Sequence, residues 1–95
     1  MVPAPERDGV GPVLEAGPLG EAVVQAIREL HPDAVITDRG AYLRVSVPRR
    51  CRVTREAIER HAGMAVRLPS DLERVMSSFK GIFRISEDEA SWATE

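Results

Sequence analysis

The segment between Gly17 and Pro32 constrains the fold most, because its residue pattern is that of an amphipathic helix. Proline suits the first helical position, since its missing N–H would be unpaired there, and Pro18 occupies that position. The apolar residues then recur at helical spacing: Leu19, Ala22, Val23, Ala26, Ile27 and Leu30. Pro32 disfavours helical geometry in the residue before it, so the helix must end near His31.

The residues after this helix predict a β-hairpin. Residues 34–37 and 42–47 have the character of strands, and the short link between them contains Gly40, which can take positive φ. In the second strand apolar and polar residues alternate, which is typical of a strand with one buried face. Pro48 ends that strand.

The other segments complete an α+β pattern. The chain predicts a strand at 10–16, a helix that Thr54 caps and Gly63 ends, a short helix at 70–79, and strands at 81–85 and 90–94. For 70–79 a strand of similar length stays an alternative. Pro12 confines the first strand to a sheet edge or a strand start. Hairpins separated by single helices indicate helices packed on a mostly antiparallel sheet.

Composition excludes several classes of protein. The net charge of −2 and the pI near 5.7 argue against a nucleic-acid binder, which usually has a strongly basic face. No apolar run approaches the roughly 18 residues that a membrane span needs. Residues 1–9 contain proline and charge without periodicity and lack the apolar segment of a signal peptide. We therefore expect a flexible tail at 1–9, a single domain at 10–95 and a cytoplasmic location.

Neither histidine belongs to a recognisable metal or catalytic motif. His31 and His61 each lie near a predicted helix end, where imidazole interacts favourably with the helix dipole. Helical metal sites often use Glu-x-x-His, which places both ligands on one face. Here Glu29 and Glu59 precede the histidines by two residues, so each pair faces different directions. We predict no metal ligands.

Cys51 is the one candidate nucleophile, and several arginines surround it. Those arginines would lower the pKa of a thiol, but no general base is identifiable, so a structural cysteine is favoured over a small cysteine enzyme. The arginine group, Arg49 to Arg55, fits either a solvated surface or a docking surface for an acidic partner. The sequence predicts no catalytic or cofactor-binding residues.

Six stretches of the chain have the residues and the spacing of a known family: Val10 to Pro12, Gly17 to Val23, Asp38 to Val45, Leu72-Glu73, Ser77 to Gly81 and Asp88 to Trp92. Together they cover roughly residues 9–93 and resemble the effector proteins of the bacterial multicomponent diiron monooxygenases of toluene, phenol, alkenes and methane. The resemblance implies a βαββ-type α+β domain with two to three helices that binds no metal, organic cofactor or substrate of its own. It implies a regulatory component that docks on the diiron hydroxylase, couples NADH oxidation to hydroxylation or epoxidation of a hydrocarbon, and is closest to the toluene and alkene type.

The resemblance also implies a set of partner-binding residues: Val10, Gly11, Pro12, Arg39, Tyr42, Arg44, Ser77, Ser78, Phe79, Lys80 and Gly81. The first three form the start of a strand next to a tail that orders on binding. Arg39, Tyr42 and Arg44 lie on the exposed side of a hairpin, although an ordinary exposed strand face fits them equally. In the Ser-Phe-x-Gly segment, Phe79 is expected to anchor the core, and the serines and glycine to form a close-approach turn. Lys80 departs from the small residue that the family usually has there.

One alternative from another class shares this architecture. A stand-alone ligand-sensing or protein-interaction domain explains the missing catalytic residues equally well. Genes for a hydroxylase, a reductase and a ferredoxin beside this one would favour the effector.

Overall fold

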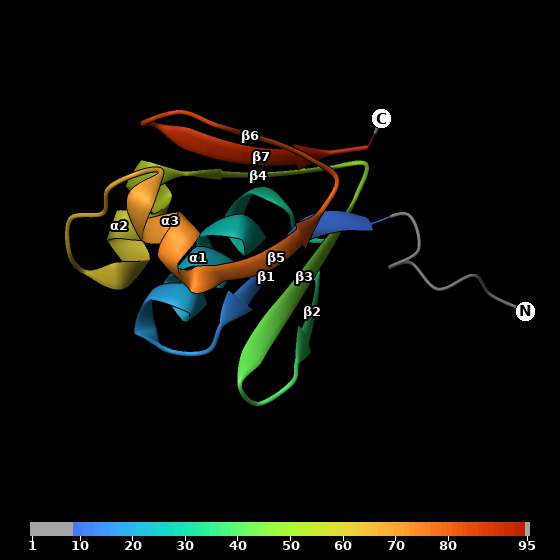
Figure 1. Ribbon diagram of the computed structural model, residues 1–95, viewed down its shortest axis with the longest axis horizontal. Coiled ribbons are helices and arrows are strands. Elements are labelled where there is room, and N and C mark those ends of the chain that lie inside the picture. The colour runs from blue at the N-terminus through green and yellow to red at the C-terminus, as the bar shows by residue number, and fades with distance from the viewer. Residues whose placement is uncertain (1–8, 95) are drawn as a thin grey trace, which may run out of the picture.

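The computed structural model describes residues 9–94, and these form two antiparallel sheets and three helices (Figure 1). The elements in chain order are β1 (Gly9–Glu15), α1 (Pro18–Leu30), β2 (Val35–Asp38), β3 (Tyr42–Pro48), β4 (Arg50–Thr54), α2 (Arg55–Ala62), α3 (Ser70–Val75), β5 (Met76–Lys80), β6 (Ile82–Ile85) and β7 (Glu89–Ala93). The strand orders are β2-β3-β1-β5 and β4-β7-β6, which confirms the α+β class with antiparallel sheet. Most of the predicted tail, residues 1–8, lies outside the described residues, whereas Gly9 already belongs to β1.

The core lies where the two sheets and the helices meet. Figure 1 shows the three-stranded sheet along the top, α1 beneath it, and α2 and α3 together at one end. The predicted stripe of α1 is buried at Val23, Ala26 and Ile27, while Leu30 at the end of the helix is 43% exposed. Removal from water of the Val23 and Ile27 side chains contributes roughly 1.5–3 kcal/mol each. None of the helices within residues 9–94 is both long and apolar enough to cross a membrane.

The caps of α2 confirm the prediction for this helix. The N–H of Ala57 donates to Oγ1 of Thr54 at 3.2 Å, and Gly63 ends the helix with φ of 70°. Glu29 of α1 reaches across to α2, where its carboxylate binds the side chains of His61 and Arg60. These contacts, His61 first, hold the pKa of the Glu29 carboxyl below its usual range and tie the two helices together.

One predicted element in the carboxyl half needs correction, and one strand there was not predicted. The helix predicted over 70–79 ends at Val75, and Met76–Lys80 form strand β5 instead. The spacing of apolar residues there fits either structure, and pairing with the free edge of β1 decides for the strand. Arg50–Thr54, for which the sequence analysis gave no element, is strand β4 and pairs with β7 along its whole length.

Pro12 was predicted to lie at a sheet edge or at a strand start, and both alternatives were wrong, since it lies in the middle of the central strand β1. β1 lies between β3 and β5, with Pro12 fully buried inside the sheet. Its register with β3 pairs Val10 with Val47 and then Val13 with Arg44, so no pair forms at Gly11 and Pro12. A central strand tolerates this proline because the ladder is interrupted where its missing N–H would have been needed.

Candidate functional site

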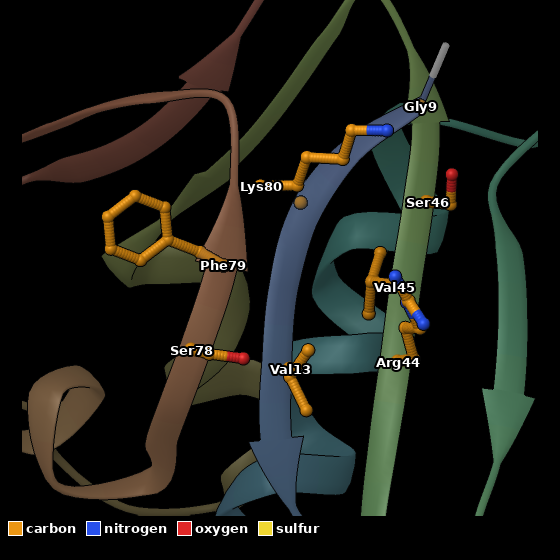
Figure 2. Close-up of a pocket in the computed structure, with 9 residues that line it drawn as sticks. Gly9, Val13, Arg44, Val45, Ser46, Ser78, Phe79 and Lys80 are labelled. Atoms are coloured by element: carbon orange, nitrogen blue, oxygen red, sulfur yellow. The ribbon is translucent and has the colours of Figure 1, made fainter. Parts of the chain in front are cut away.

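The residues predicted to bind a partner come together on three neighbouring strands, β3, β1 and β5, and on the hairpin before β3. Strands alternate their side chains between two faces, so each strand contributes one residue in two to each face. One face of this sheet is turned toward α1 and the core. Figure 2 views the opposite face, with a helix visible behind the strands. We call this opposite face the outer face.

The register aligns the outer-face residues in rows across the strands. Val13 pairs with Arg44 of β3 on one side and with Ser78 of β5 on the other. In the next row Gly11 pairs with Lys80. Arg44 on one side of β1, and Ser78 and Lys80 on the other, therefore lie on the same face of the sheet although they come from separate stretches of sequence.

An open groove of about 500 Å³ runs along one part of the outer face. Its lining residues are Val13, Arg39, Tyr42, Arg44, Ser77 and Ser78. The Ser77 hydroxyl donates to the carbonyl oxygen of Val13 at 3.3 Å, which fixes one wall of the groove to β1. Tyr42 is 45% exposed despite its size. The groove thus gathers five of the predicted residues on one accessible surface.

A second, smaller pocket of about 70 Å³ lies beside the groove, and we call it the glycine pit (Figure 2). Its lining residues are Gly9, Gly11, Val13, Arg44, Val45, Ser46, Ser78, Phe79 and Lys80. The pit exists because β1 carries no side chain at two successive outer positions. A Cβ on Gly11 would lie 2.6 Å from the carbonyl oxygen of Val45, and the φ of Gly11, 148°, is one that other residues rarely adopt.

Some predicted residues are not available for contact through their side chains. Val10 and Pro12 point into the core, where Val10 is 2% exposed. Gly81 makes a close approach, since a Cβ there would lie 2.9 Å from Cγ1 of Val10. Ser77 and Ser78 lie in strand β5 and not in a turn, so that part of the prediction was wrong. Val10, Pro12 and Gly81 therefore support the outer face from the core side of the sheet.

Phe79 is not the core anchor that the sequence suggested. Its side chain is 46% exposed, and its ring centroid lies 5.2 Å from that of Phe83. Phe83 in turn stacks on Trp92 with a centroid distance of 5.4 Å, and Trp92 is fully buried. Phe79 is therefore the exposed end of an aromatic stack that begins in the core.

The charges of the outer face are unbalanced. Arg39, Arg44 and Lys80 line the groove or the pit, and among residues 9–94 no acidic residue lines either one. Within residues 9–94, neither Arg39 nor Arg44 forms an ion pair, whereas Arg52 and Arg55 pair with Glu89 and Asp88 on another part of the surface. A chain with net charge −2 therefore carries a locally positive surface at these strands.

Four lining residues were missed by the sequence reasoning: Gly9, Val13, Val45 and Ser46. The alternation along β3 places Ser46 on the same face as Tyr42 and Arg44, so this serine was within reach of a pattern argument. Val13 could not be assigned to the site from the sequence alone, because it belongs to the site through the residues it pairs with, Arg44 on β3 and Ser78 on β5. The interruption of the β1–β3 pairing at Pro12 could not be predicted from the sequence either.

The histidines serve the structure. Nε2 of His31 accepts a hydrogen bond from the backbone N–H of Arg52 at 2.9 Å, which joins the end of α1 to β4. The His61 ring binds the carboxylate of Glu29, as described above. Among the described residues, no three His, Cys, Asp or Glu side chains are grouped so that they could hold a metal ion.

Cys51 is buried, and burial raises the pKa of its thiol to about 12. At pH 8 the thiolate fraction is then roughly 1,000-fold below that of an ordinary cysteine, so we expect very slow alkylation of the native protein by iodoacetamide. Mass spectrometry of the time course, with a urea-unfolded sample as the control, measures this. Alkylation of the native chain at the rate of the unfolded chain would bring the cysteine enzyme back into consideration.

Comparison with known proteins gives a consistent result. A sequence model of the MmoB/DmpM family matches residues 8–93. The effector subunit of the alkene monooxygenase system of Xanthobacter autotrophicus strain Py2 is 40% identical over 85 residues, which cover 87% of this chain and 83% of that protein.

Two solved structures share the fold. A chain in the structure of the phenol hydroxylase–regulatory protein complex matches with a TM-score of 0.80 and 20% identity, over 92% of this chain and 99% of that one. The regulatory protein B of soluble methane monooxygenase matches with a TM-score of 0.69 and 18% identity, over 100% of this chain and 71% of that one. At these identities the two matches concern the fold alone.

Proposed function

This chain belongs to the MmoB/DmpM family, and from that membership we propose that it is the effector subunit of a multicomponent monooxygenase. The relatives are named as effector or regulatory subunits and not as catalytic components. The observation that carries the proposal is the 40% identity to an alkene monooxygenase effector over most of both chains. Family membership favours this role over a stand-alone ligand-sensing domain. The cytoplasmic location stays a prediction.

The finer proposal is that the outer face docks on the diiron hydroxylase and regulates hydroxylation or epoxidation of a hydrocarbon of the toluene or alkene type. Three observations support this face: five of the predicted residues gather on it, Tyr42 is exposed there, and neither Arg39 nor Arg44 forms an ion pair within residues 9–94. Aromatic residues and arginine are the types enriched where protein interfaces carry most of their energy.

Binding alone does not make an effector. A protein of this kind shifts the states of the hydroxylase only by the difference between its affinities for them. A coupling free energy of about 1–3 kcal/mol is typical, and it changes an equilibrium by about 5- to 150-fold. The chain needs no chemistry of its own for this, in agreement with its structural histidines and its buried Cys51.

Reconstitution with the hydroxylase, reductase and ferredoxin encoded in the same genome tests the proposed function. We expect added protein to raise the rate of product formation and the product formed per NADH oxidised, with saturation near one effector per active site. The comparison is the same mixture without this chain. If turnover and coupling stay constant at every ratio, the effector role is wrong.

Replacing Arg39 by glutamate should raise the concentration needed for half-maximal activation by roughly 3- to 10-fold, because a charge at the rim of an interface mainly affects association. Arg39 is exposed, so its reversal should change thermal stability little. The matched control is Arg28→Glu on the exposed side of α1, away from the outer face. Equal behaviour of the two variants would place the docking surface elsewhere.

A further inference from the structure

We infer that the side of the three-stranded sheet turned away from the core, together with the chain corner that leads into it, binds a cluster of carboxylates on the surface of the hydroxylase. We call this surface the arginine face, and its residues are Arg49, Arg50, Arg52 and Arg84. The inference rests on the proposed function and adds to it a contact region on a different sheet from the groove. It also gives a role to the arginine group around Cys51.

Arg49 forms the corner where the chain leaves β3 and enters β4, and its backbone is strained. Its φ is 66°, in the left-handed region, and within residues 9–94 every other residue with a positive φ is a glycine. The carbonyl oxygen of Arg49 accepts the N–H of Thr94 at 2.9 Å, which fixes the corner against the end of β7. In this geometry a Cβ crowds a carbonyl oxygen, so glycine would suit the fold better here.

A long charged side chain at a strained position indicates a use other than folding. Arg49 is exposed, and it forms no ion pair with any residue from 9 to 94. Backbone strain of this kind is concentrated at functional sites, where a residue is kept although it lowers stability. We therefore assign to Arg49 a contact with a partner.

The register of the three-stranded sheet places three more arginines on the side away from the core. Along β4 the side chains alternate, so Cys51 is fully buried whereas Arg50 and Arg52 point the other way. Ser91 of β7 pairs with Arg52 on one side and with Arg84 of β6 on the other, so both arginines lie on one face. Figure 1 shows α1 beneath this sheet, and no helix of residues 9–94 covers its other side.

The arginine face has more guanidinium groups than its ion pairs use. Nε and Nη2 of Arg52 donate to Oε1 of Glu89 at 3.0 and 2.7 Å. Arg50 and Arg84, like Arg49, form no ion pair in the part of the chain that the structure describes. Three exposed guanidinium groups are thus presented together with one that is already paired.

Guanidinium groups of this number select an acidic protein surface. Arginine binds carboxylates through planar, paired hydrogen bonds, and such charge-assisted bonds are stronger than neutral ones. Binding of nucleic acid, the other common polyanion, requires a strongly basic domain, whereas this chain has a net charge of −2. The last residue of β3, Pro48, directly precedes Arg49, so the arginine face continues from the strand that carries Tyr42 and Arg44. One partner protein can therefore contact both surfaces.

Arg49→Gly is the decisive variant, because stability and binding should change in opposite directions. Glycine relieves the left-handed strain, so we expect the melting temperature to rise by roughly 2–6 °C. The substitution also removes a guanidinium, so we expect the Kd for the resting hydroxylase, measured by calorimetry, to rise by about 3- to 10-fold. Arg49→Lys is the matched control. It keeps both the charge and the strain, and it should bind more tightly than Arg49→Gly at an unchanged melting temperature.

The double variant Arg50→Gln and Arg84→Gln tests the rest of the face without any backbone strain. Both residues are exposed, so the melting temperature should stay constant. We expect the Kd to rise by about 10-fold, and binding to become less sensitive to added salt. Arg28→Gln, on the exposed side of α1, is the matched control and should bind like the wild type. In a double-mutant cycle, one Asp→Asn or Glu→Gln change on the hydroxylase should couple to Arg50 or Arg84.

The outcomes separate this inference from the proposed function. If the wild-type chain neither binds nor activates the hydroxylase, both fall. If it activates but Arg49→Gly binds as tightly as the wild type, or the double variant binds as tightly as Arg28→Gln, only the arginine face is overturned. A lower melting temperature for Arg49→Gly would mean that this side chain serves the fold, and would overturn the arginine face as well.

Discussion

Replacing Trp92 by alanine is expected to lower the free energy of unfolding by about 3–5 kcal/mol, the usual range for removing a large aromatic side chain from a core. Trp92 is fully buried on β7, pairs in register with Cys51 and Phe83, and stacks on the Phe83 ring. Small domains have a total stability of about 5–15 kcal/mol, so much of the variant would be unfolded under mild conditions. Urea titration followed by far-ultraviolet circular dichroism measures the loss.

Trp92→Phe is the matched control. The indole Nε1 of Trp92 has no hydrogen-bond partner within the described part of the chain, so phenylalanine forfeits volume but no hydrogen bond. We expect it to cost clearly less than alanine. A loss below about 1 kcal/mol for Trp92→Ala would mean that the two sheets do not pack around this side chain in solution.

Gly20→Ala is the second substitution with a large expected effect. The expected change in stability is opposite in sign to the change that helix propensity predicts. Alanine normally stabilises a helix interior by about 1 kcal/mol relative to glycine. Here a Cβ on Gly20 would lie 2.0 Å from the carbonyl oxygen of Glu15, a backbone atom. The start of α1 would have to move away from the end of β1, and we expect a net loss of roughly 2–3 kcal/mol.

Gln25→Ala, on the exposed side of the same helix, separates the clash from propensity. It should change stability by less than about 0.5 kcal/mol, because surface substitutions without special contacts rarely do more. The same urea titration serves both variants. Stabilisation by Gly20→Ala would show that β1 and α1 are further apart than the structure places them.

Local patterns predicted the local parts of this fold. The proline-bounded stripe of α1, the caps of α2 and the hairpin at Gly40, whose φ is 83°, all depend on residues close in sequence, and all were confirmed. The predictions were wrong where pairing with a segment distant in sequence determines the local structure. Met76–Lys80 becomes a strand because β1 is available to pair with it, and Pro12 enters a central strand because the ladder to β3 is interrupted there.

The candidate site divides in the same way. The resemblance supplied Arg44, Ser78 and Lys80 from two separate stretches of the chain, but nothing in the sequence indicated that Val13 and Gly11 would align them in rows. The exposure of Phe79 was also beyond prediction, since an apolar residue in a strand is usually buried. A depression made by two glycines becomes visible only when the neighbouring strands are in place.

The order of the strands also determines when the chain can fold during its synthesis. β1 needs β5, which ends at Lys80, and β4 needs β7, which ends at Ala93, so neither sheet is complete until most of the polypeptide has left the ribosome. Contacts between residues so far apart in sequence are slow to form, because the entropy of closing a long loop opposes them. Helix α1 and the β2–β3 hairpin depend on contacts between residues close in sequence, so we expect them to form first, before β5 and β7 are available for pairing.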